Sequence, residues 1–179
     1  MLKMDKKEDR RIALTKRMLK EALIEILKEK DIYHISIREL CEKADVNRTT
    51  FYKYYGSQFD LLSDMEEDMI VFVTEILEHG KGNLEDIIIS AAEYLESNID
   101  FARLIINNNV DPEFPERLFS IESVMSSALN NFERKETKLT FEYAYTYCTY
   151  GAFSVFCKWL NKNNRESPEE IAKIICSLM

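Results

Sequence analysis

The sequence of 179 residues has very little glycine and proline, with four and three residues respectively. Together they make up about 4 % of the chain, against roughly 12 % in average proteins. β-Sandwiches, β-barrels and glycine-rich nucleotide folds need many special turns, so this composition disfavours them. All three prolines lie beyond residue 111. The composition therefore predicts an all-α protein.

Long apolar runs are also missing. No run approaches the ~18 residues that cross a bilayer, and the N-terminal MLKMDKKEDRR is charged where a signal peptide would be apolar. Four cysteines lie in apolar helical patterns without CxxC spacing: Cys41, Cys148, Cys157 and Cys176. Buried reduced thiols are the expected state, and a redox switch is the less favoured alternative. We expect a soluble cytoplasmic protein with no membrane partner.

Motifs of catalysis and metal binding are absent as well. The chain has no GxSxG, no glycine-rich phosphate loop and no HExxH. His34 and His79 lie far apart and have no neighbouring ligand spacing, so we expect no metal and no cofactor. Glu66 and Glu67 are expected on a charged helix face, and because adjacent residues point about 100° apart on a helix, they are poorly placed for a shared acid/base site. These observations predict a protein that is not an enzyme.

Charge is distributed unevenly along the chain. Residues 1–58 contain 14 Lys and Arg against 10 Asp and Glu, whereas the remainder contains 10 against 22. A basic end on an acidic protein indicates a module that binds a polyanion. Chance variation of the surface is the alternative.

Apolar periodicity and capping signals predict nine helices. Ser36 with Glu39 forms a capping-box pattern, and Ser167-Pro168 is a clear start signal. The predicted helices span approximately 9–29, 36–43, 47–55, 57–79, 84–97, 98–108, 116–133, 139–162 and 168–179.

The segment from Ser36 to Tyr55 has the pattern of a helix–turn–helix. Two short helices joined by a turn of three or four residues cross at about 90–120°, the geometry used to read DNA. The second helix, NRTTFYKYY, has no acidic residue, and its Arg, Thr, Lys and Tyr donors suit phosphates and base edges. Many helical hairpins share this pattern, so a helical protein-interaction adaptor without DNA binding is the alternative.

Residues 12–62 closely resemble the N-terminal domain of TetR/AcrR-type bacterial transcriptional regulators. The core of the match is ADVNRTTFYKYY at 44–55, followed by Ser57 and Leu61-Leu62. Residues 150–170 are similar to the closing helices of an effector-domain subgroup that includes dihydroxyacetone-kinase regulator-like members. The resemblance implies a helix–turn–helix DNA-binding domain at 1–56 and an effector-binding and dimerisation domain at 57–179.

Two positions depart from the family pattern. Asp45 occupies a turn position that usually holds glycine, and Asp tolerates the left-handed conformation better than most residues, so the turn should survive. Gln58 occupies a position that is often a phosphate-binding Lys in the family, which places one backbone contact in doubt.

The resemblance and the polar second helix together predict a sequence-specific regulator of transcription. We expect a repressor that binds a double-stranded DNA operator and is released by a small-molecule effector. Arg48, Thr49 and Thr50 are expected near base edges, and the other predicted DNA-binding residues are Ser36, Arg38, Asn47, Tyr52, Lys53 and Tyr54. Tyr55 is expected to point to the core.

The chain is further expected to form a two-fold homodimer through its last two helices. The helix at about 139–162 is apolar on more than one face, which indicates burial on more than one side. A four-helix seam between two copies would cover these faces, and core packing within a monomer is the alternative. The expected interface residues are Cys148, Gly151, Val155, Trp159, Ile171, Ile174, Ile175 and Leu178.

The resemblance also implies a small-molecule pocket between the middle helices. Aromatic residues are frequent from 84 to 160, and cavities lined by aromatic rings suit apolar or mixed ligands. A solid core of the same residues is the alternative, and the sequence leaves the charge of the ligand open. The expected pocket residues are Tyr94, Phe101, Phe119, Tyr143, Tyr147 and Tyr150.

Overall fold

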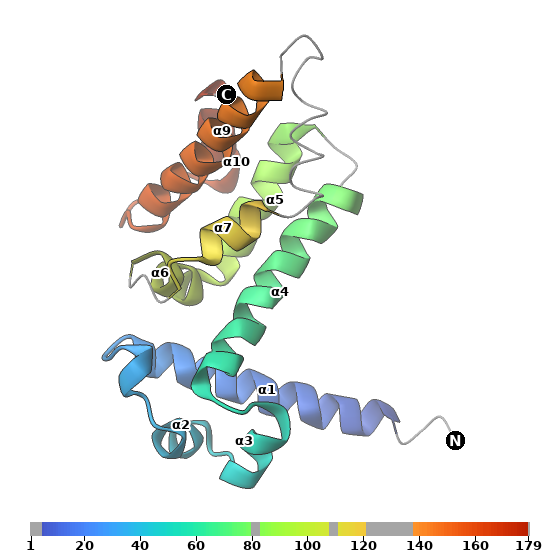
Figure 1. The fold of residues 1–179 in the computed structure, drawn as a ribbon, viewed down its shortest axis with the longest axis vertical. Helices are drawn as coiled ribbons and strands as arrows, with labels where there is room; N and C mark the ends of the chain where they lie inside the picture. The colour runs from blue at the N-terminus through green and yellow to red at the C-terminus, as the bar shows by residue number, and fades with distance from the viewer. Residues whose placement is uncertain (1–4, 80–82, 108–110, 121–137, 179) are drawn as a thin grey trace. The chain divides into compact units, whose positions relative to one another are not determined.

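The computed structural model describes residues 5–79, 83–107, 111–120 and 138–178 (Figure 1). These residues form nine α-helices and one short 3-10 turn, with no strand among them. The all-α prediction is confirmed. Contacts divide the chain into two compact units, Met1–Asp68 and Met69–Met179.

The first unit is built around a helix–turn–helix. It contains α1 (Asp5–Leu27), the turn η1 (Ile32–His34), α2 (Ile37–Ala44), α3 (Arg48–Tyr54) and the first half of α4 (Gln58–His79). α2 packs against both α1 and α3. The core of this unit includes five side chains that have no solvent exposure: Leu19, Leu23, Leu40, Phe51 and Leu61.

The second unit contains the rest of α4 and five further helices: α5 (Leu84–Ser97), α6 (Ile99–Asn107), α7 (Phe114–Phe119), α9 (Lys138–Leu160) and α10 (Pro168–Leu178). α10 packs mainly against α5, and α6 packs against α9. Trp159 is 1 % exposed and donates its indole N–H to the carbonyl of Glu166 at 2.8 Å. That hydrogen bond satisfies the polar atom of the largest side chain in this core.

Helix starts agree with the capping signals of the sequence. The backbone N–H of Glu39 donates to Ser36 Oγ at 3.2 Å, and that of Glu170 donates to Ser167 Oγ at 3.3 Å. Asn83 and Asp86 form a reciprocal capping box at the start of α5. Of the helix predicted at about 116–133, only α7 is described, and residues 121–137 lie outside the described part. No described helix is both long enough and apolar enough to cross a membrane.

α4 differs from the sequence prediction in one respect. Glu66 is only 2 % exposed, so the expectation that it lies on a charged helix face is wrong for this residue, although Glu67 is exposed. The reason is helical register, because Glu66 shares a stripe with the buried Leu62 and Met69 at i, i+4 and i+7 spacing. α4 also belongs to both units, and the predicted boundary at residue 56 precedes its first turn.

Candidate nucleic-acid interface and internal cavity

The turn between α2 and α3 depends on a left-handed residue. Asp45 adopts φ 52° and ψ 42°, and its backbone N–H donates to the carbonyl of Glu42. The next residue, Val46, donates its N–H to the carbonyl of Cys41 at 3.0 Å. These bonds close the end of α2 and redirect the chain. The expectation that Asp45 sustains the turn is confirmed.

α3 is anchored on one side and open on the other. Asn47 Oδ1 accepts from the backbone N–H of Thr49 at 2.8 Å, which caps the helix. Phe51 is fully buried and fixes the inner face. On the outer face Arg48, Thr49, Tyr52 and Lys53 are exposed, whereas Thr50 and Tyr54 are half-buried. The exposed residues of α3 therefore form an outer face that contains no acidic side chain.

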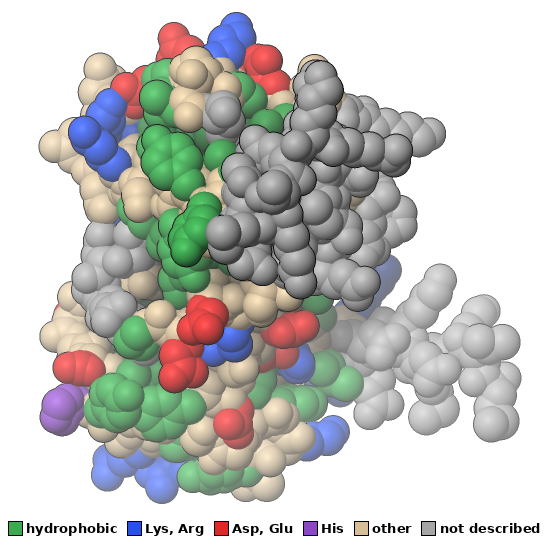
Figure 2. All heavy atoms as spheres, turned by 45° about the horizontal axis from the view of Figure 1, so that its top comes forward, with side chains coloured by type: hydrophobic (Ala, Val, Ile, Leu, Met, Phe, Trp, Pro, Cys, Tyr) green, Lys and Arg blue, Asp and Glu red, His purple; other side chains and the backbone are tan. Residues whose placement is uncertain are grey.

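The first turn of α2 adds a basic group beside this surface. Arg38 is exposed, and its Nε donates to the Glu42 carboxylate at 2.7 Å, a hydrogen bond that raises the pKa of Arg38. Arg38, Glu42, Asn47 and Arg48 line one shallow hollow. Figure 2 shows a group of Lys and Arg side chains at the lower left of the view, with hydrophobic side chains beside it. Glu42 is thus an acid that competes with phosphate for Arg38.

Gln58 contributes to the scaffold of the first unit. Its side-chain amide donates to the carbonyl of Ile32 at 3.3 Å, which ties the start of α4 to the turn η1. This hydrogen bond engages the side-chain amide of Gln58. Gln58 occupies the position at which the departure from the family pattern places a contact with the DNA backbone in doubt.

A polar network behind α3 was missed by the sequence reasoning. Tyr55, which is buried as expected, donates its hydroxyl to Asp64 on α4 at 2.7 Å. Lys20 Nζ on α1 lies 2.8 Å from the same carboxylate, and Lys16 Nζ lies 3.3 Å from it. Lys20 also pairs with Asp68. The residues of this network come from segments that are distant in sequence, so no local sequence pattern predicts it.

The hydrogen bonds of this network determine which of its side chains are charged. Burial alone would raise the pKa of Asp64, but donors from Lys20, Tyr55 and Lys16 together lower it below 3.8. Burial and the bond to Asp64 raise the pKa of the Tyr55 hydroxyl far above its usual range. Asp64 is therefore a carboxylate and Tyr55 a neutral donor at neutral pH.

The structure divides the predicted dimer residues into two groups. Trp159, Ile171 and Ile175 are buried within the chain, because α10 packs onto α5 and α9 in the same unit. In the single chain these three side chains have almost no solvent-exposed surface, although Ile175 also lies in the lining of the groove described next. The others are exposed or half-buried: Cys148, Gly151, Val155, Ile174 and Leu178.

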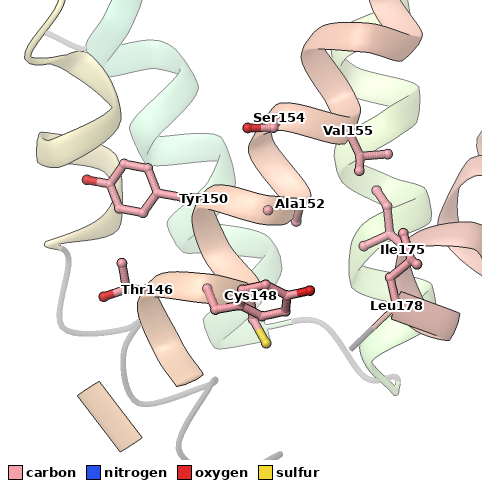
Figure 3. A pocket seen from close by; sticks show the side chains of 10 residues that line it. Thr146, Cys148, Tyr150, Ala152, Ser154, Val155, Ile175 and Leu178 are labelled. Atoms are coloured by element: carbon pink, nitrogen blue, oxygen red, sulfur yellow. The ribbon is translucent and has the colours of Figure 1, made fainter. Parts of the chain in front are cut away.

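An apolar groove lies along α9 and α10, and several of these exposed and half-buried residues line it. Its lining includes Cys148, Gly151, Val155 and Leu178 (Figure 3). In this view Val155 of α9 points toward α10, whereas Tyr150 lies on the opposite side of α9.

A separate internal cavity of about 210 Å³ lies between α4, α5, α6, α7 and α9. Of the predicted pocket residues, Tyr94 and Phe119 line it. Phe101 is buried without lining it, while Tyr147 and Tyr150 line the groove instead. Tyr143 is 71 % exposed and lines neither. The departure has a simple cause, since aromatic periodicity cannot tell which face of a helix meets a cavity.

The second half of the chain decides its family. Residues 82–179 match the TetR-family model described as "Transcriptional regulator C-terminal region", which is more than half of the chain. The chain belongs to the TetR family. The resemblance read from residues 12–62 and 150–170 is thereby confirmed, and the TetR family consists of regulators of transcription.

Individual relatives of this TetR-family chain are distant. It is 24 % identical over 169 residues to the uncharacterized HTH-type transcriptional regulator YxbF of Bacillus subtilis strain 168, covering 90 % of this chain and 43 % of YxbF. The chain thus spans less than half the length of that curated relative.

Solved structures share the fold. A TetR regulator from Streptococcus agalactiae 2603V has a TM-score of 0.70 at 20 % identity over 96 % of both chains. The dihydroxyacetone kinase operon activator DhaS has a TM-score of 0.61 at 19 % identity, covering 92 % of this chain and 93 % of its own. PfmR from Thermus thermophilus has a TM-score of 0.62 at 16 % identity, covering 90 % of this chain and 96 % of its own. The DhaS match agrees with the subgroup expected from the C-terminal segment.

Proposed function

We propose that this TetR-family regulator binds a double-stranded DNA operator by inserting α3 into the major groove. Arg48, Thr49 and Thr50 face base edges, as their place at the N-terminal end of α3 suits. The remaining residues hold phosphates or position the helix: Ser36, Arg38, Asn47, Tyr52, Lys53 and Tyr54. The observation that supports this proposal is the exposed, acid-free outer face of a helix fixed by Asn47 and Phe51.

TetR-family regulators dimerise, and we propose that this chain does so through the apolar groove of α9 and α10. A two-fold dimer presents two copies of α3, so the operator is a near-palindrome with half-sites a helical turn or more apart. Leu178, which lines the groove and is exposed, supports this face, because large apolar side chains on a surface mark interaction sites; Ile174 is exposed on the same helix, α10.

We further propose that the protein is a repressor released by a small molecule bound in the internal cavity. α4 supplies part of the cavity wall and is separated from α3 by only three residues, and it belongs to both the DNA-reading and the cavity-forming units. A ligand acts as a switch only if it binds one arrangement of the two α3 helices better than the other.

The DNA proposal is tested by selecting bound fragments from the source genome and measuring operator affinity of variants. Arg48→Ala should reduce discrimination between operator and mismatched DNA by about 1–3 kcal/mol. Tyr52→Phe removes only a phosphate-binding hydroxyl, so it should weaken all sequences alike. Lys53→Ala should do the same and lower the salt dependence, whereas Lys173→Ala, which removes an exposed lysine of α10, serves as the matched control.

Two results would contradict the proposal. One is unchanged operator affinity when Tyr52→Phe and Lys53→Ala are combined. The other is the absence of any salt-dependent binding to DNA by the full chain, which would favour the protein-interaction adaptor.

A further inference from the structure

The described part of the wall of the internal cavity is uncharged. Of the described residues, eighteen line it, and none of these is Asp, Glu, Lys, Arg or His. Its side-chain hydroxyls belong to Tyr94 and Thr149, and Thr149 Oγ1 already donates to the carbonyl of Tyr145 at 2.7 Å. Moving an ion from water into such a wall has a large desolvation cost and no opposite charge to offset it. A charged effector is therefore a poor occupant.

The volume of the cavity limits the size of the occupant. The described lining bounds a volume of about 210 Å³, below the roughly 300–1,000 Å³ of drug-sized sites. An engineered apolar cavity of about 150 Å³ in another protein stays dry and binds benzene. The present cavity therefore accommodates one six-membered ring with a short substituent.

The walls also favour a flat molecule. Phe72 of α4 and Tyr94 of α5 stack with ring centroids 4.0 Å apart and planes 15° from parallel. Across the lining, Phe119 and Phe153 meet edge to face at 5.8 Å. Aromatic rings gain from stacked and edge-to-face contacts beyond the area they bury. A ring that enters this space can make both kinds of contact.

We propose that the effector of this regulator is a neutral aromatic molecule of a single ring with at most a short apolar substituent. This inference rests on the proposed effector-controlled function and names the ligand class for the same cavity. Phe72 gives the ligand a direct route to α4, because a ring beside the Phe72–Tyr94 stack displaces a side chain of the helix that begins beside α3.

The experiment compares two probes of matched shape on the full-length protein, toluene and benzoate. Toluene should raise the melting temperature progressively with its concentration, as ligand binding to the native state requires, and benzoate should bind at least tenfold more weakly. Ala91→Phe places a ring in the cavity from its α5 wall and should weaken toluene binding at least tenfold. Ala13→Phe, on the exposed side of α1, is the matched control and should leave it unchanged.

A second variant guards against a folding failure of Ala91→Phe. Phe72→Ala enlarges the cavity and should shift preference from toluene toward naphthalene. Equal binding of benzoate and toluene would overturn the proposal, and so would undiminished toluene binding in folded Ala91→Phe.

Operator binding measured in parallel separates this proposal from the proposed function. Binding of toluene in the cavity with unchanged operator affinity establishes the ligand chemistry and overturns toluene-driven release. Operator release by benzoate but not toluene overturns the ligand class and preserves the effector switch.

Discussion

At the scale of single residues, Asp45 has the most demanding backbone of the helix–turn–helix. Its φ of 52° lies in the left-handed region, which costs most L-residues about 1–2 kcal/mol and Asp or Asn less. The side chain is exposed, so little packing depends on it. Conformation therefore dominates the effect of substitutions at this position.

We expect Asp45→Gly to raise the free energy of unfolding by about 0.5 kcal/mol and Asp45→Ala to lower it by about 1 kcal/mol. Both variants remove the same carboxylate, so the difference between their free energies of unfolding reports the effect of backbone conformation at this position. Urea denaturation of the full chain followed by circular dichroism measures both values. Equal stabilities of the Gly and Ala variants would show that the left-handed conformation is not a determinant of this turn.

At the scale of elements, local signals predicted helices well and tertiary contacts poorly. Ser36, Asn83 and Ser167 cap helices as the sequence indicated, because a capping bond joins residues two or three positions apart. The burial of Glu66 and the convergence of Lys20 with Asp64 depend on segments that are distant along the chain. Such contacts produce no periodic pattern in the sequence.

The Asp64 network predicts a pH-dependent link between α1 and α4. The pKa of Asp64 is lower in the folded chain than its ordinary value of 3.8. The stabilisation is thus complete above that ordinary value and is lost as the pH falls through the lower folded pKa. We expect Asp64→Asn to reduce the free energy of unfolding at pH 7 by about 1–2 kcal/mol, a figure lowered for partial solvent exposure.

Urea titrations between pH 7 and pH 3 measure this link. The difference between wild type and Asp64→Asn should shrink below about pH 4, where the Asp64 carboxylate of the unfolded chain takes up a proton before that of the folded chain does. Glu67→Gln, on the exposed side of the same helix, is the control and should show no such convergence. A difference that stays constant over the whole range would rule out the ionised carboxylate as its source.

At the scale of the whole molecule, the sequence predicted which segments have functional surfaces better than which side chains form them. The resemblance located the helix–turn–helix, and the orientation of its short second helix follows from the single buried Phe51. For α9 the prediction was less specific. Two of its faces are apolar, and only packing against α5, α6 and α10 decides that Trp159 is internal while Gly151 is exposed.

Gly151 offers the sharpest test of the proposed dimer. A Cβ at this position would meet no atom within 4 Å in the described chain, so a side chain fits a single copy without strain. Glycine within a helix is also less stable than other residues by up to about 1 kcal/mol. Gly151→Arg should therefore leave the monomer fold intact or stabilise it. If this face meets its two-fold copy, however, the substitution places two guanidinium groups in an apolar seam and separates the subunits.

We expect sedimentation to show a dimer for wild type at micromolar concentration and a monomer for Gly151→Arg, with helicity unchanged by circular dichroism. Operator affinity should fall at least tenfold, because a monomer contacts one half-site and loses the effective concentration of the second α3. Ser97→Arg adds the same charge at the exposed end of α5 and should remain dimeric. A dimer that persists in Gly151→Arg would place the subunit contact on another face, and the apolar groove of α9 and α10 would then need a different occupant.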